Sequence, residues 1–336
     1  MRILVVGAGA VGGYFGGRLL EAGRDVTFLV RPRRATELAA SGLIIRSRYG
    51  DVTFPAPPTV LAENLKPEFD LILLSCKAYD LEGAIASFAP AVGSQTVILP
   101  LLNGMGHLDI LDERFGRERV LGGWCFIAAT LNERREIAHL NEVHDLGFGE
   151  RSDIGPSVSP GREKESNPKS EDGLSERVRA IAKLMEGVRF EVRPSRDALA
   201  SMWSKWVFLA PLAAGTCLMR ASIGDIVAAP GGADLMLGLA EECSAIAAAQ
   251  GYSVPEKLLE NSRTRLTTAG STLTASMLRD IQNNAPIEAD HIVGDLLRRR
   301  GGASQGQGVA SGDRSLLGIA YTHLKAYEAG RAAGGS

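Results

Sequence analysis

The sequence predicts an α/β domain built on a doubly wound, mainly parallel sheet, followed by an all-α domain. In the first half, short aliphatic runs alternate with helical patterns, which is typical of parallel strands covered by helices on both faces. In the second half, apolar residues recur at helical spacing. The chain has 336 residues, which is long for a single hydrophobic core. We therefore expect one domain over residues 1–150, a flexible linker or loop over 151–175, and a helical domain over 176–330.

The strands of the first domain are predicted from runs rich in Val, Ile and Leu. Little polar alternation interrupts the runs Ile3–Val6, Val26–Val30, Leu71–Ser75 and Thr96–Leu101. Strands that are buried on both faces have this composition. Beyond Leu121, shorter runs suit added antiparallel strands at Trp124–Thr130, Ile137–Leu140 and Leu146–Phe148.

Two stretches poor in aliphatic residues interrupt this pattern. Residues 151–175 and 301–312 are rich in Gly, Ser and other polar residues, so they cannot bury a core and are expected to be exposed, mobile loops. The clearest helical periodicity is found at Ser201–Met219, Ala233–Gln250, Ser271–Ile281 and Leu316–Ala329. The apolar run within the first of these is shorter than the roughly 20 residues of a membrane span, so we expect a buried helix there.

Composition excludes several classes of function. A net charge of −2 gives no broad attraction to nucleic acid or to an anionic membrane. The 4 cysteines lie far apart in the sequence, which argues against a disulfide framework and against a zinc site, and no metal is expected. The 5 histidines are scattered, and each is expected to be structural or exposed. Only four aliphatic residues follow Met1 and Arg2, too few for a secretory signal, so we expect a soluble cytoplasmic protein.

A glycine-rich turn follows the first predicted strand and opens a helical run. It comprises Gly7, Ala8, Gly9, Ala10, Val11 and Gly12. In this G-x-G-x-x-G pattern the first glycine permits a tight turn, the second lets the backbone approach a pyrophosphate, and the third lets helix and strand pack closely. The helix N-terminus then offers N–H groups and a partial positive charge to the pyrophosphate. The turn therefore predicts a Rossmann domain that binds a dinucleotide.

The end of the second predicted strand favours NADP(H) over NAD(H). Enzymes that use NAD usually carry Asp or Glu there, which accepts hydrogen bonds from the ribose 2′-hydroxyl. Here the strand is followed by Arg31, Arg33 and Arg34, with no carboxylate. A 2′-phosphate needs cationic, preferably forked, donors. Arg31 is the best placed of the three, although a solvated basic loop is the simpler alternative.

Polar residues also interrupt apolar surroundings at five later positions. Lys77 and Asn103 follow predicted strands, at the carboxyl ends where open α/β sheets bind ligands. Lys205 lies between tryptophans on a predicted helix, and Ser276 precedes Glu288 by twelve residues. Hydride transfer to a carbonyl leaves negative charge on its oxygen, and a fixed lysine can both stabilise that charge and donate a proton.

Taken together, these motifs resemble the ketopantoate reductase (2-dehydropantoate 2-reductase) family. The resemblance rests on GAGAVGGYFGGRL, the strand–Cys–Lys–Ala turn, NGMG, the W-x-K helix, and SMLRDI with its downstream glutamate. It implies a C-terminal domain like that of 6-phosphogluconate dehydrogenase. It also implies reduction of ketopantoate by NADPH to (R)-pantoate, a step of pantothenate and coenzyme A synthesis, by a monomer or homodimer.

The resemblance assigns roles residue by residue. Lys205 matches the lysine that donates the proton to the substrate carbonyl oxygen, and Asn103 matches an asparagine beside both nicotinamide and substrate. Ser276 matches a substrate contact. The glycine turn and Arg31 match the contacts to the pyrophosphate and the 2′-phosphate. The remaining cofactor contacts implied by the family are Lys77, Ala129 and Glu288.

The match fails at two substrate positions. The family usually carries asparagines four and eight residues after the catalytic lysine, and here these positions are Leu209 and Ala213. Aliphatic side chains cannot hydrogen-bond a substrate hydroxyl or carboxylate. The sequence therefore leaves open ketopantoate itself, a more apolar 2-oxo acid or related carbonyl compound, and a non-catalytic NADP(H)-binding sensor.

Overall fold

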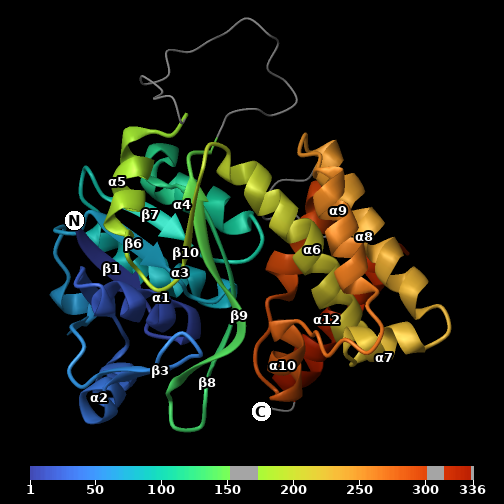
Figure 1. Cartoon of the computed structure of the whole chain (residues 1–336), viewed down its shortest axis with the longest axis horizontal. Helices are drawn as coiled ribbons and strands as arrows, with labels where there is room; N and C mark the ends of the chain where they lie inside the picture. The colour runs from blue at the N-terminus through green and yellow to red at the C-terminus, as the bar shows by residue number, and fades with distance from the viewer. Residues whose placement is uncertain (152–172, 301–313, 334–336) are drawn as a thin grey trace, which may run out of the picture. The chain divides into compact units, whose positions relative to one another are not determined.

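The computed structural model describes residues 1–151, 173–300 and 314–333, which form two compact units (Figure 1). Over these residues, the first unit comprises 1–102, 107–151 and 173–198. The second comprises 103–106, 199–300 and 314–333. Most of the predicted loop at 151–175, and all of that at 301–312, lies outside the described residues.

The first unit contains the predicted parallel sheet. Its strand order is β5-β2-β1-β6-β7, and every neighbouring pair is parallel. The strands are β1 (Arg2–Val6), β2 (Asp25–Leu29), β5 (Thr59–Val60), β6 (Leu71–Leu74) and β7 (Val97–Pro100). The chain runs outward from β1 through β2 to β5 and then crosses back to β6 beside β1, so the strand order reverses between β1 and β6, as at the switch point of a doubly wound sheet.

Among the described residues, five α-helices accompany the strands of this unit. They are α1 (Ala10–Glu21), α2 (Pro32–Ser41), α3 (Leu81–Phe88), α4 (Gly106–Phe115) and α5 (Glu176–Leu184). Helix α1 lies between two sheets, and its glycines make this possible. A Cβ on Gly16 would lie 2.6 Å from the ring of Phe28 in β2, and one on Gly17 would lie 2.6 Å from Ile45 of the second sheet. The glycines thus let α1 approach both sheets more closely than a helix with larger side chains could.

The second sheet runs β10-β9-β3-β4, with β8 paired to β9. Its strands are β3 (Leu43–Arg46), β4 (Val52–Phe54), β8 (Gly122–Leu131), β9 (Ile137–Gly149) and β10 (Glu191–Ser195). The predicted antiparallel extension is confirmed by the pairing of β8 with β9. The two short runs expected at 137–140 and 146–148 are one continuous strand, β9, while β3, β4 and β10 were not predicted.

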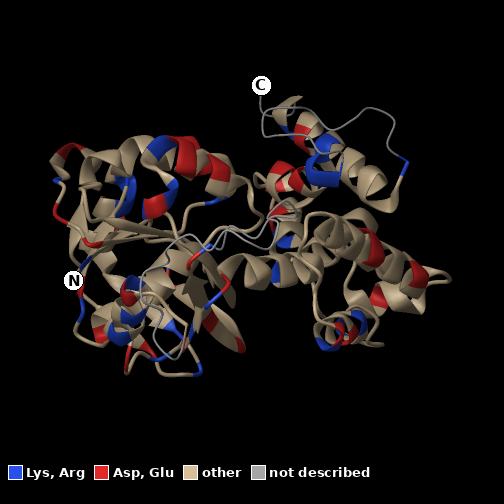
Figure 2. Ribbon diagram, turned by 90° about the horizontal axis from the view of Figure 1, so that it is seen from above, with Lys and Arg blue, Asp and Glu red and all other residues tan. Residues whose placement is uncertain are grey.

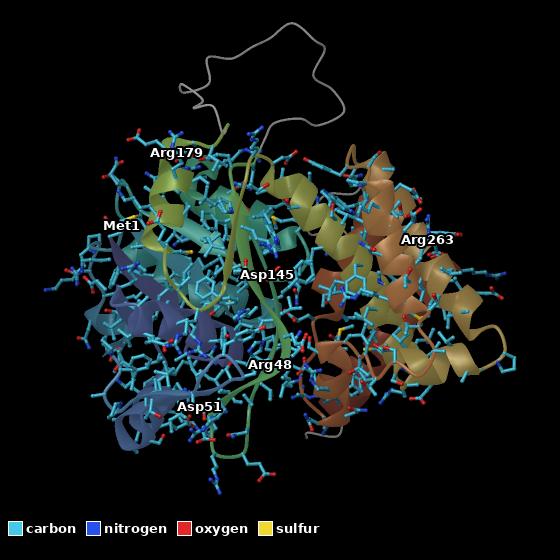
Figure 3. The ribbon with its side chains drawn as sticks, in the orientation of Figure 1. Met1, Arg48, Asp51, Asp145, Arg179 and Arg263 are labelled. Atoms are coloured by element: carbon cyan, nitrogen blue, oxygen red, sulfur yellow. The ribbon has the colours of Figure 1, made fainter. Side chains whose placement is uncertain are left out.

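The boundary expected near residue 175 is placed too early, because residues 176–198 belong to the first unit. Strand β10 pairs in parallel with β9, and Arg193 Nε donates to Asp145 Oδ2 at 2.7 Å; Asp145 is labelled in Figure 3. Val178 and Ile181 of α5 are fully buried in the core of this unit.

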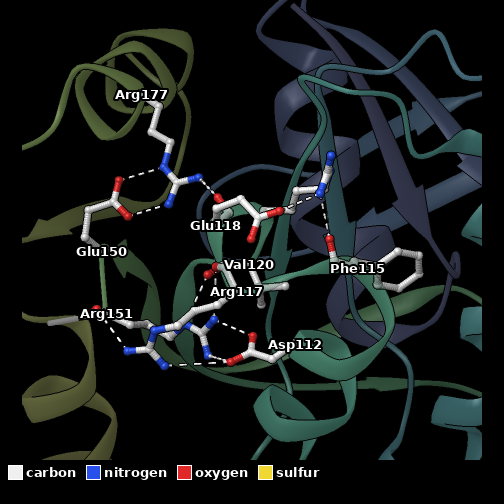
Figure 4. Close-up of polar contacts among 9 residues, drawn as sticks. Asp112, Phe115, Arg117, Glu118, Val120, Glu150, Arg151 and Arg177 are labelled. Atoms are coloured by element: carbon white, nitrogen blue, oxygen red, sulfur yellow. Dashed lines mark hydrogen bonds and ion pairs between the residues drawn. The ribbon is translucent and has the colours of Figure 1, made fainter. Parts of the chain in front are cut away.

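Charged side chains reinforce this attachment of α5 (Figure 4). Arg177 of α5 donates to both carboxylate oxygens of Glu150, with Nε at 2.6 Å from Oε1. Next to it, Arg151 forms a two-pronged contact with Asp112 of α4, at 3.0 and 2.5 Å. Two-pronged contacts between an arginine and a carboxylate fix the relative orientation of the two side chains as well as attracting them.

The predicted all-α character of the second domain is confirmed over the described residues of the second unit. Its elements are α6 (Ala198–Met219, which starts at the last residue of the first unit), α7 (Ile223–Ala228), α8 (Gly232–Ala249), α9 (Glu256–Leu266), α10 (Ser276–Gln282), the π-helix η5 (Asp290–Gly294), α11 (Asp295–Arg300) and α12 (Leu316–Ala333).

The helix expected at Ser271–Ile281 begins only at Ser276. The preceding residues are not helical, and two of their carbonyl groups accept hydrogen bonds from the start of α7 instead. Ile223 N donates to Leu273 O at 3.0 Å, and Gly224 N donates to Ser271 O at 2.8 Å.

Acidic and basic residues are interspersed along the described parts of both units (Figure 2), in keeping with the small net charge. Among the described residues, no helix combines the length and the apolar character that crossing a membrane requires.

Candidate active site

The glycine turn leads from β1 into α1 in the first unit. Gly7 has a φ of +95°, a conformation that disfavours residues with a Cβ, and its N–H donates to Leu29 O at 3.0 Å. A Cβ on Gly12 would lie only 2.1 Å from Ser75 Oγ. At Gly9, the N-cap of α1, a Cβ would meet nothing within 4 Å. Since α1 has no side-chain cap and no acidic residue in its first turn, its N-terminus suits an anion.

Ser75 supports the glycine turn, a role that sequence reasoning missed. The residue directly follows β6, and its Oγ donates to Val6 O at 3.0 Å. This hydrogen bond ties the end of β6 to the end of β1, where the turn begins. The available signal was a hydroxyl at the end of an otherwise aliphatic run.

The three arginines after β2 have different environments. Arg31 is the N-cap of α2, its side chain is 75% exposed, and Nη2 donates to Asp80 Oδ1 at 2.8 Å. The hydrogen bond to Asp80 raises the pKa of Arg31 above its ordinary value. Arg34 is largely buried, and its Nε donates to Ala8 O of the glycine turn at 3.1 Å. Arg33 lies in solvent at 91% exposure. Asp80 was not predicted as a partner of Arg31.

Two further predicted cofactor contacts lie in the first unit. Lys77 is partly buried and is the N-cap of the short 3-10 helix Ala78–Asp80 that follows β6. Ala129 lies in β8 beside an irregularity in its pairing with β9, opposite His139. A break in the ladder of this kind is common next to functional sites. The cofactor roles of both residues stay predictions.

The second unit brings Asn103 and Lys205 together. Lys205 extends from α6, is only 8% exposed, and its Nζ donates to Asn103 Oδ1 at 2.9 Å. Asn103 lies in the short segment between β7 and α4. A buried ammonium is costly unless a polar group solvates it, and the amide oxygen does so here. Residues far apart in sequence thus form one polar pair.

The π-helix η5 lies next to this pair. A Cβ on Gly104 would lie 2.2 Å from His291 O, so the turn containing Asn103 packs directly on the π-helix backbone. Trp206, the residue after Lys205, donates from Nε1 to Ile292 O at 2.9 Å. Glu288, buried at 5% exposure, precedes η5 by two residues. π-helical turns are rare and occur frequently at functional sites.

Burial lowers the pKa of His291, which lies in η5. Sequence reasoning missed η5, because apolar spacing does not distinguish a π-turn from an α-turn.

The remaining substrate positions lie on α10 and α6. Ser276 is the first residue of α10 and is half-buried, and it makes no hydrogen bond to Asn103 or Lys205. Leu209, four residues after Lys205, is partly exposed, whereas Ala213 is fully buried. Of the two positions where the sequence departs from the family pattern, only Leu209 is accessible.

A second polar cluster lies in the first unit, so its histidines are not scattered as the sequence suggested. Tyr14 Oη lies 2.7 Å from His144 Nδ1, and the Tyr49 ring stacks on His144 at 3.9 Å between centroids. His139 stacks on His144 at 5.5 Å, and its Nδ1 lies 3.0 Å from Ser47 Oγ. Burial lowers the pKa of His144.

Comparison with family models and curated proteins places these features in context. The model described as Ketopantoate reductase PanE/ApbA matches residues 3–153, and the corresponding C-terminal model matches residues 197–306. An uncharacterized oxidoreductase, YkpB of Bacillus subtilis, is 35% identical over 98% of this chain and 99% of its own length. A 2-dehydropantoate 2-reductase of Nostoc is 24% identical over 89% of this chain and 88% of its own length.

Solved structures share the fold over nearly the whole chain. A 2-dehydropantoate 2-reductase from Geobacter metallireducens superposes with a TM-score of 0.79 at 25% identity, covering 97% of this chain and 99% of that one. D-mandelate dehydrogenase, solved with NADH and anilino(oxo)acetate, superposes with a TM-score of 0.79 at 19% identity, over 98% of this chain and 99% of its own. At that identity the likeness concerns the fold alone.

Proposed function

Because this chain belongs to the ketopantoate reductase family and is an oxidoreductase acting on a CH–OH or C=O group, we propose that it reduces the keto group of a 2-oxo acid with NADPH. The leading candidate substrate is 2-dehydropantoate, which would yield (R)-pantoate. The observation that carries the proposal is the buried ammonium of Lys205, held by Asn103 Oδ1 at 2.9 Å.

The glycine turn fits the pyrophosphate of the dinucleotide. The backbone from Gly7 to Gly12 leads into an uncapped helix N-terminus, and the open space at Gly9 leaves room for a phosphate to approach the main chain. Ala8, Ala10 and Val11 belong to the same turn and would contact the cofactor through it. Lys77, Ala129 and Glu288 complete the cofactor contacts in this proposal.

Arg31 is the proposed contact to the 2′-phosphate of NADPH. Among the described residues, only its Nη2 is engaged, with Asp80, so further N–H groups of the fork are available to an anion. Arg34 is less suited to this role, because Ala8 O and Glu37 hold its Nε and Nη1, and its remaining Nη2 is buried.

In the proposed reaction, the keto carbon accepts a hydride, which NADPH supplies when bound. The negative charge that develops on the keto oxygen is neutralised by a proton from Lys205 Nζ, and the lysine regains a proton from water. Asn103 accepts a hydrogen bond from the same ammonium and so fixes its direction. Ser276 is proposed to hold the substrate.

The Lys205→Ala variant tests the proposal. We expect kcat to fall by about 10²–10⁴-fold, the usual contribution of a positioned acid. The affinity for NADPH should hardly change, because the proposed pyrophosphate and 2′-phosphate contacts lie in the first unit. Both are measured on wild type and variant, by NADPH oxidation with a panel of 2-oxo acids and by a binding titration. An unchanged kcat would remove Lys205 from the mechanism.

A second candidate substrate is a 2-oxo acid with a more apolar side chain. It is favoured by Leu209, which is accessible on α6 where the family usually carries a hydrogen-bonding asparagine. The same substrate panel decides between the two: faster turnover of aliphatic or aromatic 2-oxo acids than of ketopantoate would favour this candidate. No turnover of any carbonyl compound by a protein that binds NADPH would favour a sensor instead.

A further inference from the structure

A 2-oxo acid presents a carboxylate to its enzyme as well as a keto group. Its carboxylate is charged throughout the reaction, and a carboxylate that leaves water needs a cation or several hydrogen-bond donors. If Lys205 serves the keto oxygen, another group must serve the carboxylate. Leu209 and Ala213 supply no donor for it, and the hydroxyl of Ser276 carries no charge.

Arg265, in the last turn of α9, has the required chemistry. Its guanidinium carbon lies 4.2 Å from the centroid of the Phe208 ring on α6, a cation–π contact that fixes the planar fork. Arg265 is an exposed residue, yet the packing around its guanidinium lowers its pKa, and no acidic residue offsets that effect. Among the described residues, no carboxylate pairs with this arginine.

Arg263, two residues earlier on the same helix, behaves differently. Its Nη1 donates to Glu256 Oε1 at 2.6 Å, so its charge is already satisfied within α9; it is labelled in Figure 3. The two arginines therefore form a natural comparison, one paired with a carboxylate of the protein and the other lying over an aromatic ring.

The position of Phe208 relates Arg265 to the proposed proton donor. Phe208 and Leu209 follow Lys205 by three and four residues, and residues at these spacings are neighbours on one face of a helix. One face of α6 thus carries the ammonium, the ring under the guanidinium and an accessible aliphatic side chain.

We propose that Arg265 binds the carboxylate of the 2-oxo acid, with the side chain of the substrate packing against Leu209. This assignment rests on the proposed function and deepens it: it names the residue that distinguishes an acid from a neutral ketone. Guanidinium binds carboxylate in a two-pronged geometry that also orients the plane of the substrate. The substrate class is then a 2-oxo acid with an aliphatic or aromatic side chain.

The test compares Arg265→Met with its matched control Arg263→Met. The substrate is the 2-oxo acid that wild type reduces fastest, assayed as the free acid and as its methyl ester. We expect Arg265→Met to lower kcat/KM for the acid by about 10–100-fold, mostly through KM, as for the loss of a hydrogen-bonded charged contact. Its kcat/KM for the ester should match that of wild type. Arg263→Met should leave both values unchanged.

Several outcomes would overturn the assignment. They are an equal loss on acid and ester, no loss on the acid, or the same selective loss in the control Arg263→Met. If wild type reduces no 2-oxo acid, the proposed function fails. The carboxylate site is then tested separately, by measuring the binding of ketoisovalerate to the two variants in the presence of NADP⁺. Weaker binding to Arg265→Met than to Arg263→Met supports the site, and equal binding refutes it.

Discussion

At the scale of single residues, Arg31 and Arg34 lie in one short segment but have different environments. Arg34 is buried against Ala8 O and Glu37, so it stabilises the glycine turn from within the protein. Arg31 is exposed and meets only Asp80 among the described residues. A sequence shows that both are cations, but only the structure shows which one presents its donors to solvent.

Cofactor preference provides the prediction at this scale. Arg31→Ala should weaken NADPH binding at least tenfold while changing NADH binding little, since the hydrogen-bonded charge contact it removes involves only the 2′-phosphate. Asp80→Asn should act in the opposite direction, because it removes a carboxylate that competes for Arg31. Dissociation constants for both dinucleotides measure this, with Arg33→Ala as the control. Equal losses for NADPH and NADH would mean that the phosphate is bound elsewhere.

At the scale of elements, α1 and η5 shape the candidate site. The N-terminus of α1 is the proposed phosphate contact. η5 is held at several points: Tyr321 and Lys325 of α12 donate to the carboxylate of Asp290 at 2.5 and 2.9 Å, and Trp206 donates to Ile292 O. These contacts hold in place the π-turn that follows Glu288, and with it the backbone on which Gly104 packs.

The start of α1 allows a paired prediction. Gly12→Ala should destabilise the first unit, because its Cβ would lie 2.1 Å from Ser75 Oγ and 2.3 Å from Gly7 O; overpacking of this kind costs about 1–3 kcal/mol. Gly9→Ala should melt like wild type, since nothing lies within 4 Å of its Cβ, yet bind NADPH weakly because the proposed phosphate contact uses that space. Thermal melts and binding titrations separate the two. Normal NADPH affinity in Gly9→Ala would contradict the proposed pyrophosphate site.

Much of the first sheet could be predicted because strands buried on both faces are continuous aliphatic runs, as in β6 and β7. β10 could not, since its sequence EVRPS is mostly exposed and contains a proline. β9 was divided into two because its middle, around Asn141 to His144, is polar.

For the candidate site, the glycine turn could be predicted from local spacing alone. The Asn103–Lys205 pair was suggested only by the family resemblance, because no local pattern joins residues so distant in sequence. Arg265 carried no sequence signal at all, since its significance depends on which ring it lies over.

At the scale of the whole molecule, each unit contains a histidine whose pKa is lowered by burial, His144 in the first and His291 in the second. In the window between that lowered pKa and the ordinary value near 6.5, the unfolded chain binds more protons than the folded one. The stability that each neutral histidine contributes is therefore fully present at pH values above its ordinary pKa. That contribution is lost as pH falls through the window.

We expect the unfolding temperature to fall between about pH 7.5 and about pH 5, a range above the titration of most carboxylates. His144→Asn should reduce this fall, because an amide can still accept a hydrogen bond from Tyr14 but cannot be protonated in this range. Melting curves across that range measure the effect. The same pH dependence in wild type and variant would show that His144 does not contribute.

The four residues 103–106 belong to the second unit although the chain on both sides of them belongs to the first. Modules of this protein are therefore not contiguous stretches of its gene. A chimera spliced at residue 198 would inherit Lys205 from one parent and its amide partner from the other. Recombination between relatives would preserve the pair only where both parents carry it, which couples the evolution of two halves that look separable on a linear map.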